Sequence, residues 1–371
     1  MTKAIGLVQT GVRQCEFEEF PLPVLGEGEV LVRVEANGIC ASDVPSYNAT
    51  DFYWKDGTRR ILGHEIVGIV EDMGPKTRNR DHISPGDRVC VYGFVVCGTC
   101  PACLRGDSQG CSGFRIPLHY GVVPTSVAPG LWGGYATHCY VPANGVLYKM
   151  PSDVNALDAT LWNPLSGGYE WGINQGGIKP GDKVLIMGAG QRGLAAIFPT
   201  LHAGADFVAL TGLSKDDYKL ALALEFGANA VCDVEKNDPV EWAHEVTGGT
   251  GFDVILDMTP HAVQPLVDAV EMVKRMGTIV VIGLKMRPLN DFPIDRFLFK
   301  RIRMQGWVGQ NNDAMQFAAD LVASKKYPLH KMRTHVFGFD QLGLAIDTLT
   351  GDVPGEKAIN VVVTPTMSAS A

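Results

Sequence analysis

Short apolar runs separated by glycine and proline dominate the first part of the chain. Three of these runs are EVLVRVE (29–35), IVGIVE (66–71) and DRVCV (87–91). Runs this short, rich in β-branched residues and bounded by turn residues, are typical of strands. The pattern predicts an antiparallel, barrel-like β domain with loops.

From Asp182 onward the pattern alternates between strands and helices. Helices are expected to begin at Gly193 and Lys215, and near Pro239 and Val263. The apolar runs between them are KVLIM (183–187), FVALTG (207–212), AVCD (230–233), DVILDM (253–258) and TIVVIG (278–283). This alternation predicts an α/β domain with a parallel sheet and helices on both of its faces.

The two patterns divide the chain into two domains. With 371 residues, the chain is longer than a single hydrophobic core usually supports. We expect the β domain to cover residues 1–160 and the α/β domain to cover residues 161–305. Residues 306–371 have a mixed pattern, with one helix over Asp313–Ser324.

Composition and charge exclude several classes of partner. The chain is 46% hydrophobic and has a net charge of −8, with no cluster of lysine or arginine that would suit a nucleic acid or an anionic membrane surface. The N-terminal sequence MTKAIGLVQT lacks the apolar core of a signal peptide, and no apolar run is long enough to span a bilayer. We therefore expect a cytoplasmic protein with reduced thiols that binds neither nucleic acid nor membrane.

Four of the nine cysteines lie in one stretch, CGTCPACLRGDSQGC (97–111). In a reducing compartment, four thiolates this close together suit a tetrahedral zinc ion, with Cys97, Cys100, Cys103 and Cys111 as ligands. An iron–sulfur cluster is the alternative, but the stretch lacks the x3-C-P ending that follows C-x2-C-x2-C in ferredoxins. Because four thiolates leave no open position for a substrate, this zinc would be structural.

A glycine loop follows the first strand of the α/β domain and opens a helix. Glycines at these places allow a tight turn and the close approach of a pyrophosphate to the helix N-terminus. The G-x-G-x-x-G pattern is specific here because it lies between a strand and a helix. The expected cofactor contacts in the loop are Gly188, Gly190, Gln191, Arg192 and Gly193.

The end of the next strand indicates which dinucleotide is bound. In proteins that bind NAD, an acidic residue at this place accepts hydrogen bonds from the adenosine ribose. Here the strand ends at Gly212, and Leu213, Ser214 and Lys215 follow; a hydroxyl and an ammonium suit a 2′-phosphate. The next two residues are aspartates, which would repel a phosphate. We favour NADP over NAD, and the expected contacts here and at the fifth strand are Gly212, Ser214, Lys215, Ile282 and Gly283.

Further motifs follow one another in order along the chain. Asn37–Asp43 reads NGICASD, and Gly63-His64-Glu65 follows it. With the cysteine stretch, the glycine loop, PGDRV (85–89), GGYA (133–136) and KPGDKV (179–184), these motifs closely resemble the zinc-dependent medium-chain dehydrogenase/reductase family. That family includes alcohol, polyol and sugar dehydrogenases. The resemblance implies a GroES-like barrel, completed by the C-terminal segment, and a Rossmann domain.

The resemblance also implies roles for five residues of the first domain. Cys40 and His64 correspond to ligands of a catalytic zinc, and both are preferred zinc donors. Ser42 corresponds to a hydroxyl that relays the alcohol proton, Asp43 to a carboxylate that orients His64, and Glu65 to an acid that can approach the metal. Zinc would stabilise the alkoxide while hydride passes to the nicotinamide.

Two positions depart from the family pattern. The family's third zinc ligand is a cysteine, glutamate or aspartate, and here that place is Asn163, 25 residues before the glycine loop. An amide oxygen is a weaker donor, so the alternatives are ligation by Asn163, recruitment of Glu65 or water, two protein ligands, or no zinc. The second departure is Pro45, where many relatives have a histidine that passes the proton to solvent. Here the relay would have to end in water or use another group, such as Tyr47 or His138, whose positions the sequence does not give.

The main interpretation is a dehydrogenase with two zinc ions per chain that reversibly oxidises a small alcohol to a ketone or aldehyde. The alcohol is expected to be secondary, cyclic or polyol-like, with contacts from residues 46–60, from the segment around 114–132 and from the stretch after Gly283. One alternative is a zinc-poor reductase of a C=C or C=N bond; another is a binding protein without activity. A homodimer or homotetramer is a family expectation.

Overall fold

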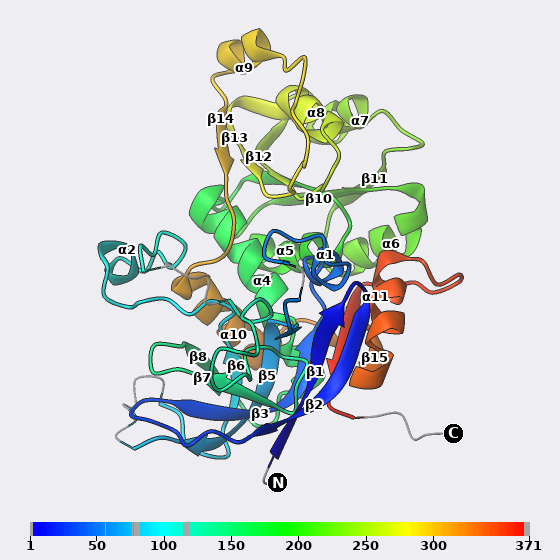
Figure 1. Cartoon of the computed structure of the whole chain (residues 1–371). Helices are drawn as coiled ribbons and strands as arrows, with labels where there is room; N and C mark the ends of the chain where they lie inside the picture. Colours follow the sequence, from blue (N-terminus) through cyan, green and yellow to red (C-terminus); the bar gives the residue numbers. More distant parts are fainter. Residues whose placement is uncertain (1–2, 56, 76, 78–81, 114–118, 367–371) are drawn as a thin grey trace. The chain divides into compact units, whose positions relative to one another are not determined.

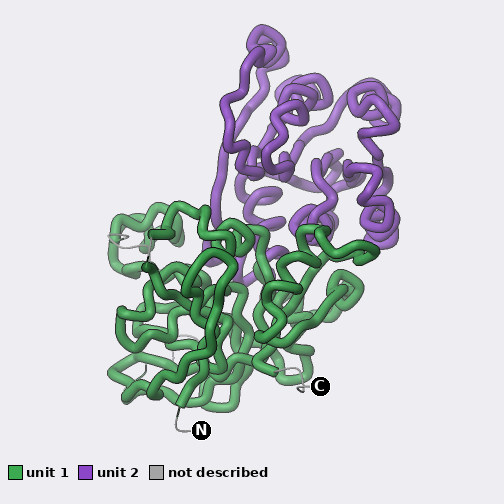
Figure 2. Tube along the Cα trace, turned by 45° about the vertical axis from the view of Figure 1, so that its right-hand side comes forward, with its two compact units in different colours: residues 1–163, 319–371 green, residues 164–318 purple. Residues whose placement is uncertain are grey.

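The computed structural model describes residues 3–55, 57–75, 77, 82–113 and 119–366, which form two compact units. The first unit contains Met1–Asn163 and Ala319–Ala371, and the second contains Pro164–Ala318 (Figure 2). The boundaries that we expected at 160 and 305 differ from these units chiefly at residues 306–318, which belong to the second unit. This segment begins at the end of the last strand of the second unit, and it belongs to that unit rather than to the first.

The first unit contains two sheets. In the smaller sheet, β1 (Lys3–Gly11) lies between β2 (Gln14–Pro21) and β4 (Arg60–Ile61), and both pairings are antiparallel. The larger sheet has the order β15-β16-β3-β5-β6-β8, and β7 also pairs with β3. Its strands are β3 (Val30–Gly38), β5 (Glu65–Met73), β6 (Arg88–Val91), β7 (His138–Val141), β8 (Leu147–Met150), β15 (Arg333–Gly338) and β16 (Asn360–Thr364).

The C-terminal segment completes the larger sheet. β16 pairs antiparallel with the end of β3, where Val362 lies opposite Gly38, and it pairs parallel with β15. The alternate residues Val361 and Val363 of β16 share a buried core with Ile66 of β5. The C-terminal segment therefore contributes two strands, β15 and β16, to the larger sheet of the first unit.

Short helices connect the strands of the first unit. They are α1 (Asp43–Tyr47), α2 (Pro101–Leu104), α3 (Ala156–Ala159), the 3-10 turns η3 (Leu329–Lys331) and η4 (Phe339–Gln341), and α11 (Leu342–Thr350). Two further helices, α4 (Trp162–Tyr169) and α10 (Asn312–Ser324), contain the points at which the chain passes between the units. Within the described ranges, no helix is both long enough and apolar enough to cross a membrane.

The second unit is built on a parallel sheet of order β11-β10-β9-β12-β13-β14 (Figure 1). The strands are β9 (Lys183–Met187), β10 (Phe207–Gly212), β11 (Ala230–Asp233), β12 (Phe252–Asp257), β13 (Val273–Val281) and β14 (Arg303–Gly306). Numbered within this unit, the order is 3-2-1-4-5-6, which is the order of dinucleotide-binding Rossmann folds. The predicted parallel sheet is confirmed.

Helices follow most of these strands along the chain. They are α5 (Gln191–His202), the 3-10 turn η2 (Ser214–Asp216), α6 (Asp217–Glu225), α7 (Pro239–Thr247), α8 (Gln264–Met272) and α9 (Ile294–Lys300). The π-helical turn η1 (Glu170–Gln175) precedes β9, the first of these strands along the chain. The first of the expected helices begins two residues before the predicted Gly193, because Gly190 already serves as its N-cap.

Candidate metal centres and cofactor site

The first candidate metal centre joins two segments of the first unit, one after β3 and one at the start of β5. Cys40 follows the end of β3, His64 precedes β5, and Glu65 begins β5 opposite Gly38 of β3. All three side chains are buried, and their potential ligand atoms lie within 4.8 Å of one another. A thiolate, an imidazole and a carboxylate at this spacing fit the preferences of a zinc ion.

Asp43 lies against the two residues expected to hold this metal. Its Oδ2 atom accepts a hydrogen bond from the Cys40 backbone N–H at 2.8 Å, and its Oδ1 atom lies 3.4 Å from His64 Nδ1. The Cys40 carbonyl in turn accepts from the Asp43 N–H at 2.9 Å. Because Nδ1 faces the carboxylate, the other ring nitrogen of His64 is left for a metal.

Burial and charge act in opposite directions on His64. Desolvation lowers the pKa of the imidazole, but Asp43 and Cys40 raise it by more, so the pKa lies well above its usual value. The His119 ring lies 4.9 Å from the His64 ring and 4.3 Å from the Phe94 ring. Burial, followed by the charge of His64, lowers the pKa of His119 well below its usual value. His119 is therefore neutral, and sequence reasoning did not identify it.

Three other residues singled out from the sequence lie in this unit. Asn163 is buried in the first turn of α4. Ser42 precedes α1 and is exposed, and its side chain makes no hydrogen bond that caps the helix. Pro45 lies in the first turn of α1, where a proline is tolerated because its N–H would have no helical partner.

The two alternative proton carriers are engaged elsewhere. The Tyr47 hydroxyl donates to the Arg13 carbonyl at 3.1 Å, and the Arg13 guanidinium lies 5.2 Å from the Tyr47 ring centre. His138 lies opposite Arg33 on β3, whereas Glu65 lies opposite Gly38. At about 3.3 Å per residue, His138 is about 16 Å along the strand from the metal centre.

The second candidate metal centre is the four-cysteine lobe around α2. The Sγ atoms of its cysteines lie within 4.8 Å of one another, with Cys97 and Cys103 at 3.8 Å and Cys100 and Cys103 at 3.5 Å. Four sulfurs at about 2.3 Å from a tetrahedral zinc would be about 3.8 Å apart. The arrangement therefore fits a zinc ion with four thiolate ligands, the last of which is Cys111.

Backbone N–H groups also point at these sulfurs. The Cys100 N–H donates to Cys97 Sγ at 3.4 Å, and the Cys103 N–H donates to Cys100 Sγ at 3.5 Å. These donors favour thiolates: the N–H groups of Cys103 and Ser112 lower the pKa of Cys100 to about 5. Burial, followed by the neighbouring sulfurs, raises the pKa of Cys103 to about 12.

The glycine loop of the second unit has the geometry of a phosphate-binding turn. Gly188 has a φ of +110°, which favours glycine, and a Cβ atom on Gly193 would lie 1.9 Å from the Gly188 carbonyl oxygen. A Cβ on Gly190 would meet nothing within 4 Å. Because Gly190 is the N-cap of α5, the open space lies at the N-terminus of a helix, where an anion is favoured.

Arg192 is positioned by an aromatic ring that sequence reasoning missed. Its guanidinium lies 5.4 Å from the ring centre of Trp171, within the π-helical turn η1. The fully buried Glu170 beside it accepts hydrogen bonds from Gln175 at 2.7 Å and from the Asn311 N–H at 3.1 Å. Trp171 lies in a π-helical turn, and no apolar pattern in the sequence indicates such a register, so its contact with Arg192 could not be predicted.

The end of β10 contains both favourable and unfavourable groups for a 2′-phosphate. A Cβ on Gly212 would lie 2.9 Å from that of Ala189, so a carboxylate does not fit there without movement. Lys215 is exposed. Ser214, however, donates its hydroxyl to Asp233 at 2.7 Å and its N–H to Glu235 at 2.7 Å, so it is bonded to two carboxylates.

The ends of β12 and β13 meet at a buried ion pair that sequence reasoning also missed. The Lys285 Nζ atom lies 2.7 Å from Asp257 Oδ2, and it donates to the Thr259 carbonyl at 2.6 Å. The N–H groups of Ile282 and Gly283 donate to the Asp257 carbonyl at 2.9 and 3.0 Å. Two of the expected cofactor contacts are thus attached to this pair, which lies next to the strand-order reversal where dinucleotides bind.

Comparisons with known proteins agree with this geometry. The sequence pattern of the alcohol dehydrogenase GroES-like domain matches residues 26–152, and that of the zinc-binding dehydrogenase domain matches residues 193–324. A Mycobacterium tuberculosis protein named as an alcohol dehydrogenase is 35% identical over 97% of this chain and 98% of its own length. The L-threonine 3-dehydrogenase of Bacillus velezensis is 31% identical over 79% of this chain and 80% of its own.

A solved structure extends the likeness to the whole fold. The structure of a zinc-binding dehydrogenase from Sinorhizobium meliloti, bound to NADP, superposes with a TM-score of 0.83 at 26% identity. The match covers 98% of this chain and 100% of that one. With both domain patterns present and relatives aligned along nearly its whole length, the chain belongs to the zinc-dependent medium-chain dehydrogenase/reductase family.

Proposed function

We propose that this chain transfers hydride reversibly between an alcohol and a nicotinamide dinucleotide, with zinc at the alcohol oxygen. The observation behind the proposal is the buried cluster of Cys40, His64 and Glu65, with Asp43 against Nδ1 of the imidazole. A site of this kind leaves a coordination position open for a substrate, unlike the four-cysteine lobe.

When bound, zinc would polarise the alcohol oxygen and lower its pKa. The Cys40 thiolate and the second ring nitrogen of His64 would hold the ion, and Asp43 would keep the His64 proton on Nδ1. Ser42 would accept the alcohol proton and release it to water, because its exposed hydroxyl is not used as a helix cap. This exit requires no histidine at Pro45.

For the third zinc ligand we propose Asn163, which is buried and precedes the glycine loop by the family spacing. An amide oxygen is neutral, so the net charge of the ligand set is more positive than with a cysteine or a carboxylate. A more positive set acidifies a bound alcohol more strongly but binds zinc less tightly. Together with the lobe, this gives two zinc ions per chain.

We propose NADP as the preferred cofactor. The absence of a carboxylate at Gly212 and the exposed Lys215 support it, and the NADP bound in the Sinorhizobium meliloti structure agrees. The bonds from Ser214 to Asp233 and Glu235 oppose it, because those carboxylates would repel a phosphate. The ratio of kcat/KM for NADP and NAD, measured with the same alcohol, tests the proposal directly.

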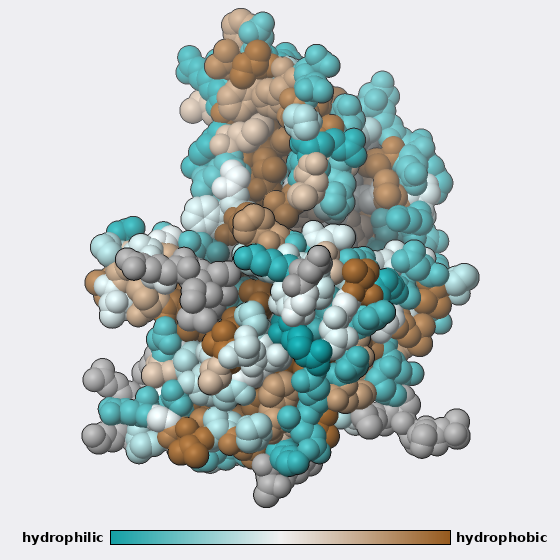
Figure 3. All heavy atoms as spheres, in the orientation of Figure 1, coloured by the Kyte–Doolittle hydropathy of each residue, from teal (hydrophilic) through white to brown (hydrophobic). Residues whose placement is uncertain are grey.

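We further propose that the cytoplasmic enzyme is a homodimer or homotetramer. No residue of α9 is buried, and its Leu298 and Phe299 are 60% and 74% exposed; apolar side chains cover this part of the surface (Figure 3). The neighbouring β14 is the edge strand of its sheet. Exposed apolar surface beside an open edge is typical of a surface covered in an assembly.

Zinc content of the purified protein, measured by elemental analysis, is the first test. About two zinc ions per chain, with oxidation of primary, secondary, cyclic or polyol substrates by NADP or NAD, would support the proposal. About one zinc, held by the lobe, with no alcohol oxidation, would contradict it. In that case the reductase of a C=C or C=N bond, which Asn163 and Pro45 favour, becomes the better candidate.

A further inference from the structure

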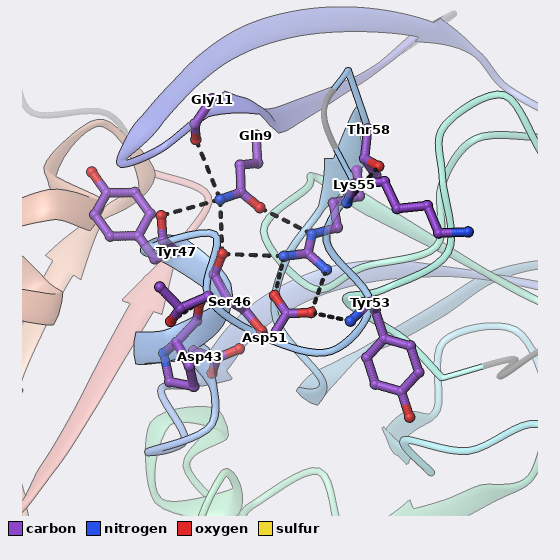
Figure 4. Close-up of polar contacts among 12 residues, drawn as sticks. Gln9, Gly11, Asp43, Ser46, Tyr47, Asp51, Tyr53, Lys55 and Thr58 are labelled. Atoms are coloured by element: carbon purple, nitrogen blue, oxygen red, sulfur yellow. Dashed lines mark hydrogen bonds and ion pairs between the residues drawn. The ribbon is translucent and has the colours of Figure 1, made fainter.

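We propose that Arg60 is a positioning residue that orients both the catalytic metal centre and the aromatic segment Asp51–Trp54. The inference rests on the proposed function, because it takes Cys40 and His64 as zinc ligands. Arg60 begins β4, four residues before His64, and its side chain is fully buried. Besides Gln9 of β1, its guanidinium bonds to two further segments, through Ser46 and Asp51, and these three partners are labelled in Figure 4.

The first of these segments is the end of α1. The Ser46 carbonyl accepts hydrogen bonds from Arg60 Nη2 at 3.1 Å and from Gln9 Nε2 at 2.8 Å. Gln9 also donates to the Tyr47 carbonyl at 3.1 Å and accepts from Arg60 Nε at 3.0 Å. Asp43, at the other end of this short helix, bonds to both Cys40 and His64. Arg60 therefore fixes the helix whose first residue orients the two ligands.

The second segment is the turn that begins at Asp51. Both carboxylate oxygens of Asp51 accept from Arg60, and one of them also accepts from the Tyr53 N–H at 2.8 Å. The Trp54 ring centre lies 5.4 Å from the Arg60 guanidinium carbon. Burial raises the pKa of Asp51, but the bonds from Arg60 lower it by more, so the carboxylate is ionised and the ion pair is complete.

This turn presents two aromatic rings to solvent. Phe52 is 93% exposed and Tyr53 is 44% exposed, and the rings meet edge to face at 5.6 Å. A turn held by a buried ion pair keeps these rings in one place, where they offer contact area to an apolar ligand at little cost in entropy. The substrate class that fits is an alcohol with an aromatic or bulky apolar group.

A second arginine of the same unit provides a matched control. Arg88 donates to both carboxylate oxygens of Glu35, at 2.7 and 3.1 Å, and to the carbonyls of Ser152 and Val154 at 2.7 and 2.8 Å. Its contacts thus have the same chemistry as those of Arg60. None of these partners is an expected zinc ligand, and none lies in the aromatic segment. Arg88 therefore contributes to the stability of the unit but does not orient the metal centre.

The first experiment compares Arg60→Lys with Arg88→Lys in the full-length zinc-loaded protein. Lysine keeps the charge but not the planar set of donors. We expect Arg60→Lys to release its catalytic zinc to a chromogenic chelator about tenfold faster or more, with a lower kcat, as for other residues that orient metal ligands. Arg88→Lys should lower Tm but keep wild-type zinc release and kcat. Equal zinc release and kcat in both variants would overturn the proposal.

The second experiment uses Asp51→Asn, which tests the role of the turn by itself and remains available if Arg60→Lys does not fold. Asparagine keeps the shape of the side chain and removes its charge. We expect KM for benzyl alcohol to rise about tenfold, the loss of one good apolar contact, while KM for ethanol and the zinc content stay near wild type. Phe52→Ala should show the same selectivity. An equal change of KM for both alcohols, or no change, would overturn the assignment of the turn.

A readout independent of activity separates this inference from the proposed function. If the wild-type protein holds only the lobe zinc and oxidises no alcohol, the proposed function has failed. Hydrogen exchange of residues 40–47 and 51–54 then tests the positioning role by itself. Faster exchange in Arg60→Lys, with wild-type exchange in Arg88→Lys, supports the role; unchanged exchange in both variants overturns it.

Discussion

At the scale of single residues, Asp43 links the two residues that we expect to hold the catalytic zinc. One of its carboxylate oxygens accepts the Cys40 N–H, and the other lies 3.4 Å from His64 Nδ1. The spacing of Cys40 and Asp43 in GICASD closes a tight turn, since the Asp43 N–H returns to the Cys40 carbonyl. A single carboxylate thus holds the backbone of one expected ligand and would fix the tautomer of the other.

Replacing Asp43 by asparagine should weaken the catalytic site without disturbing the lobe. An amide can still accept the Cys40 N–H, but its NH2 group would then face His64 Nδ1 and favour a proton on the metal-binding nitrogen. We expect a loss of about 10- to 100-fold in zinc affinity or kcat, with one zinc per chain retained by the lobe. Competition with a chelator measures the affinity. Asp87→Asn, which removes a charge from a turn next to Lys149, is the control and should change neither quantity.

The raised pKa of His64 predicts how the stability of the zinc-free protein depends on pH. Because the folded state holds the His64 proton more tightly than the unfolded state, the stabilisation is fully present below the unfolded pKa of about 6.5. It is lost as the pH rises through the folded pKa. Urea unfolding of chelator-treated protein at pH 6 and pH 9 should therefore show lower stability at pH 9. His64→Asn should remove this part of the slope; an unchanged slope would contradict the assignment.

Sequence alone identified the candidate residues that the structure brings together, but not the contacts that hold them in place. Cys40, His64 and Glu65 belong to short motifs, and the structure brings their ligand atoms within 4.8 Å. The ion pair of Arg60 with Asp51 has no motif, because it depends on how β4 pairs with β1. His119 was missed for a similar reason: its place beside His64 follows from the fold of a loop.

At the scale of elements, the strand ends of the second unit form one polar edge. The Asp257–Lys285 pair joins the segment after β12 to the segment after β13, and a Cβ on Gly283 would lie 2.6 Å from the backbone of Thr259. On the other side, a Cβ on Gly188 would lie 3.3 Å from the Met258 carbonyl. The glycine loop and both segments are therefore in close contact, so the ion pair would help to hold the candidate cofactor site in shape.

Lys285→Met should consequently affect both stability and cofactor binding. The substitution leaves the fully buried Asp257 carboxylate without its ion-pair partner, which costs about 3–5 kcal/mol of unfolding free energy. We also expect a higher KM for the cofactor and an unchanged KM for the alcohol. Lys274→Met is the matched control, because Lys274 pairs with Asp253 of the same strand but is 42% exposed. It should cost at most about 1 kcal/mol, as measured by denaturant unfolding.

The elements that sequence predicted best are those buried on both faces. Lys183–Met187 and Phe207–Gly212 are buried along almost their whole length, and they begin and end where the apolar runs do. In contrast, β2 reads QCEFEEFP and is mostly exposed, and α9 buries none of its residues. Because few or none of their residues are buried, their apolar and polar residues carry no signal of packing against the rest of the chain. Sequence alone therefore could not place these two elements.

At the scale of the whole molecule, the chain passes twice between its units. It leaves the first unit after Asn163 and returns at Ala319, and its last strand, β16, pairs with β3 near the metal centre. The first unit holds both candidate zinc sites, and the second holds the glycine loop. Metal and cofactor should therefore stabilise different parts of one chain.

Scanning calorimetry of the full-length protein tests this division. NADP at about 100 times its Kd should stabilise the second unit by about 2.7 kcal/mol, whereas a strong chelator should destabilise the first. We expect two unfolding transitions, of which the chelator lowers the temperature of one and NADP raises the temperature of the other.

Gly190→Ala is the control: its Cβ meets nothing within 4 Å and its φ of −73° suits alanine, so it should leave both transitions in place. The added methyl group occupies the space where a pyrophosphate would approach the helix, so it should abolish the NADP shift alone. A single transition that responds to both ligands would instead show that the two units unfold together.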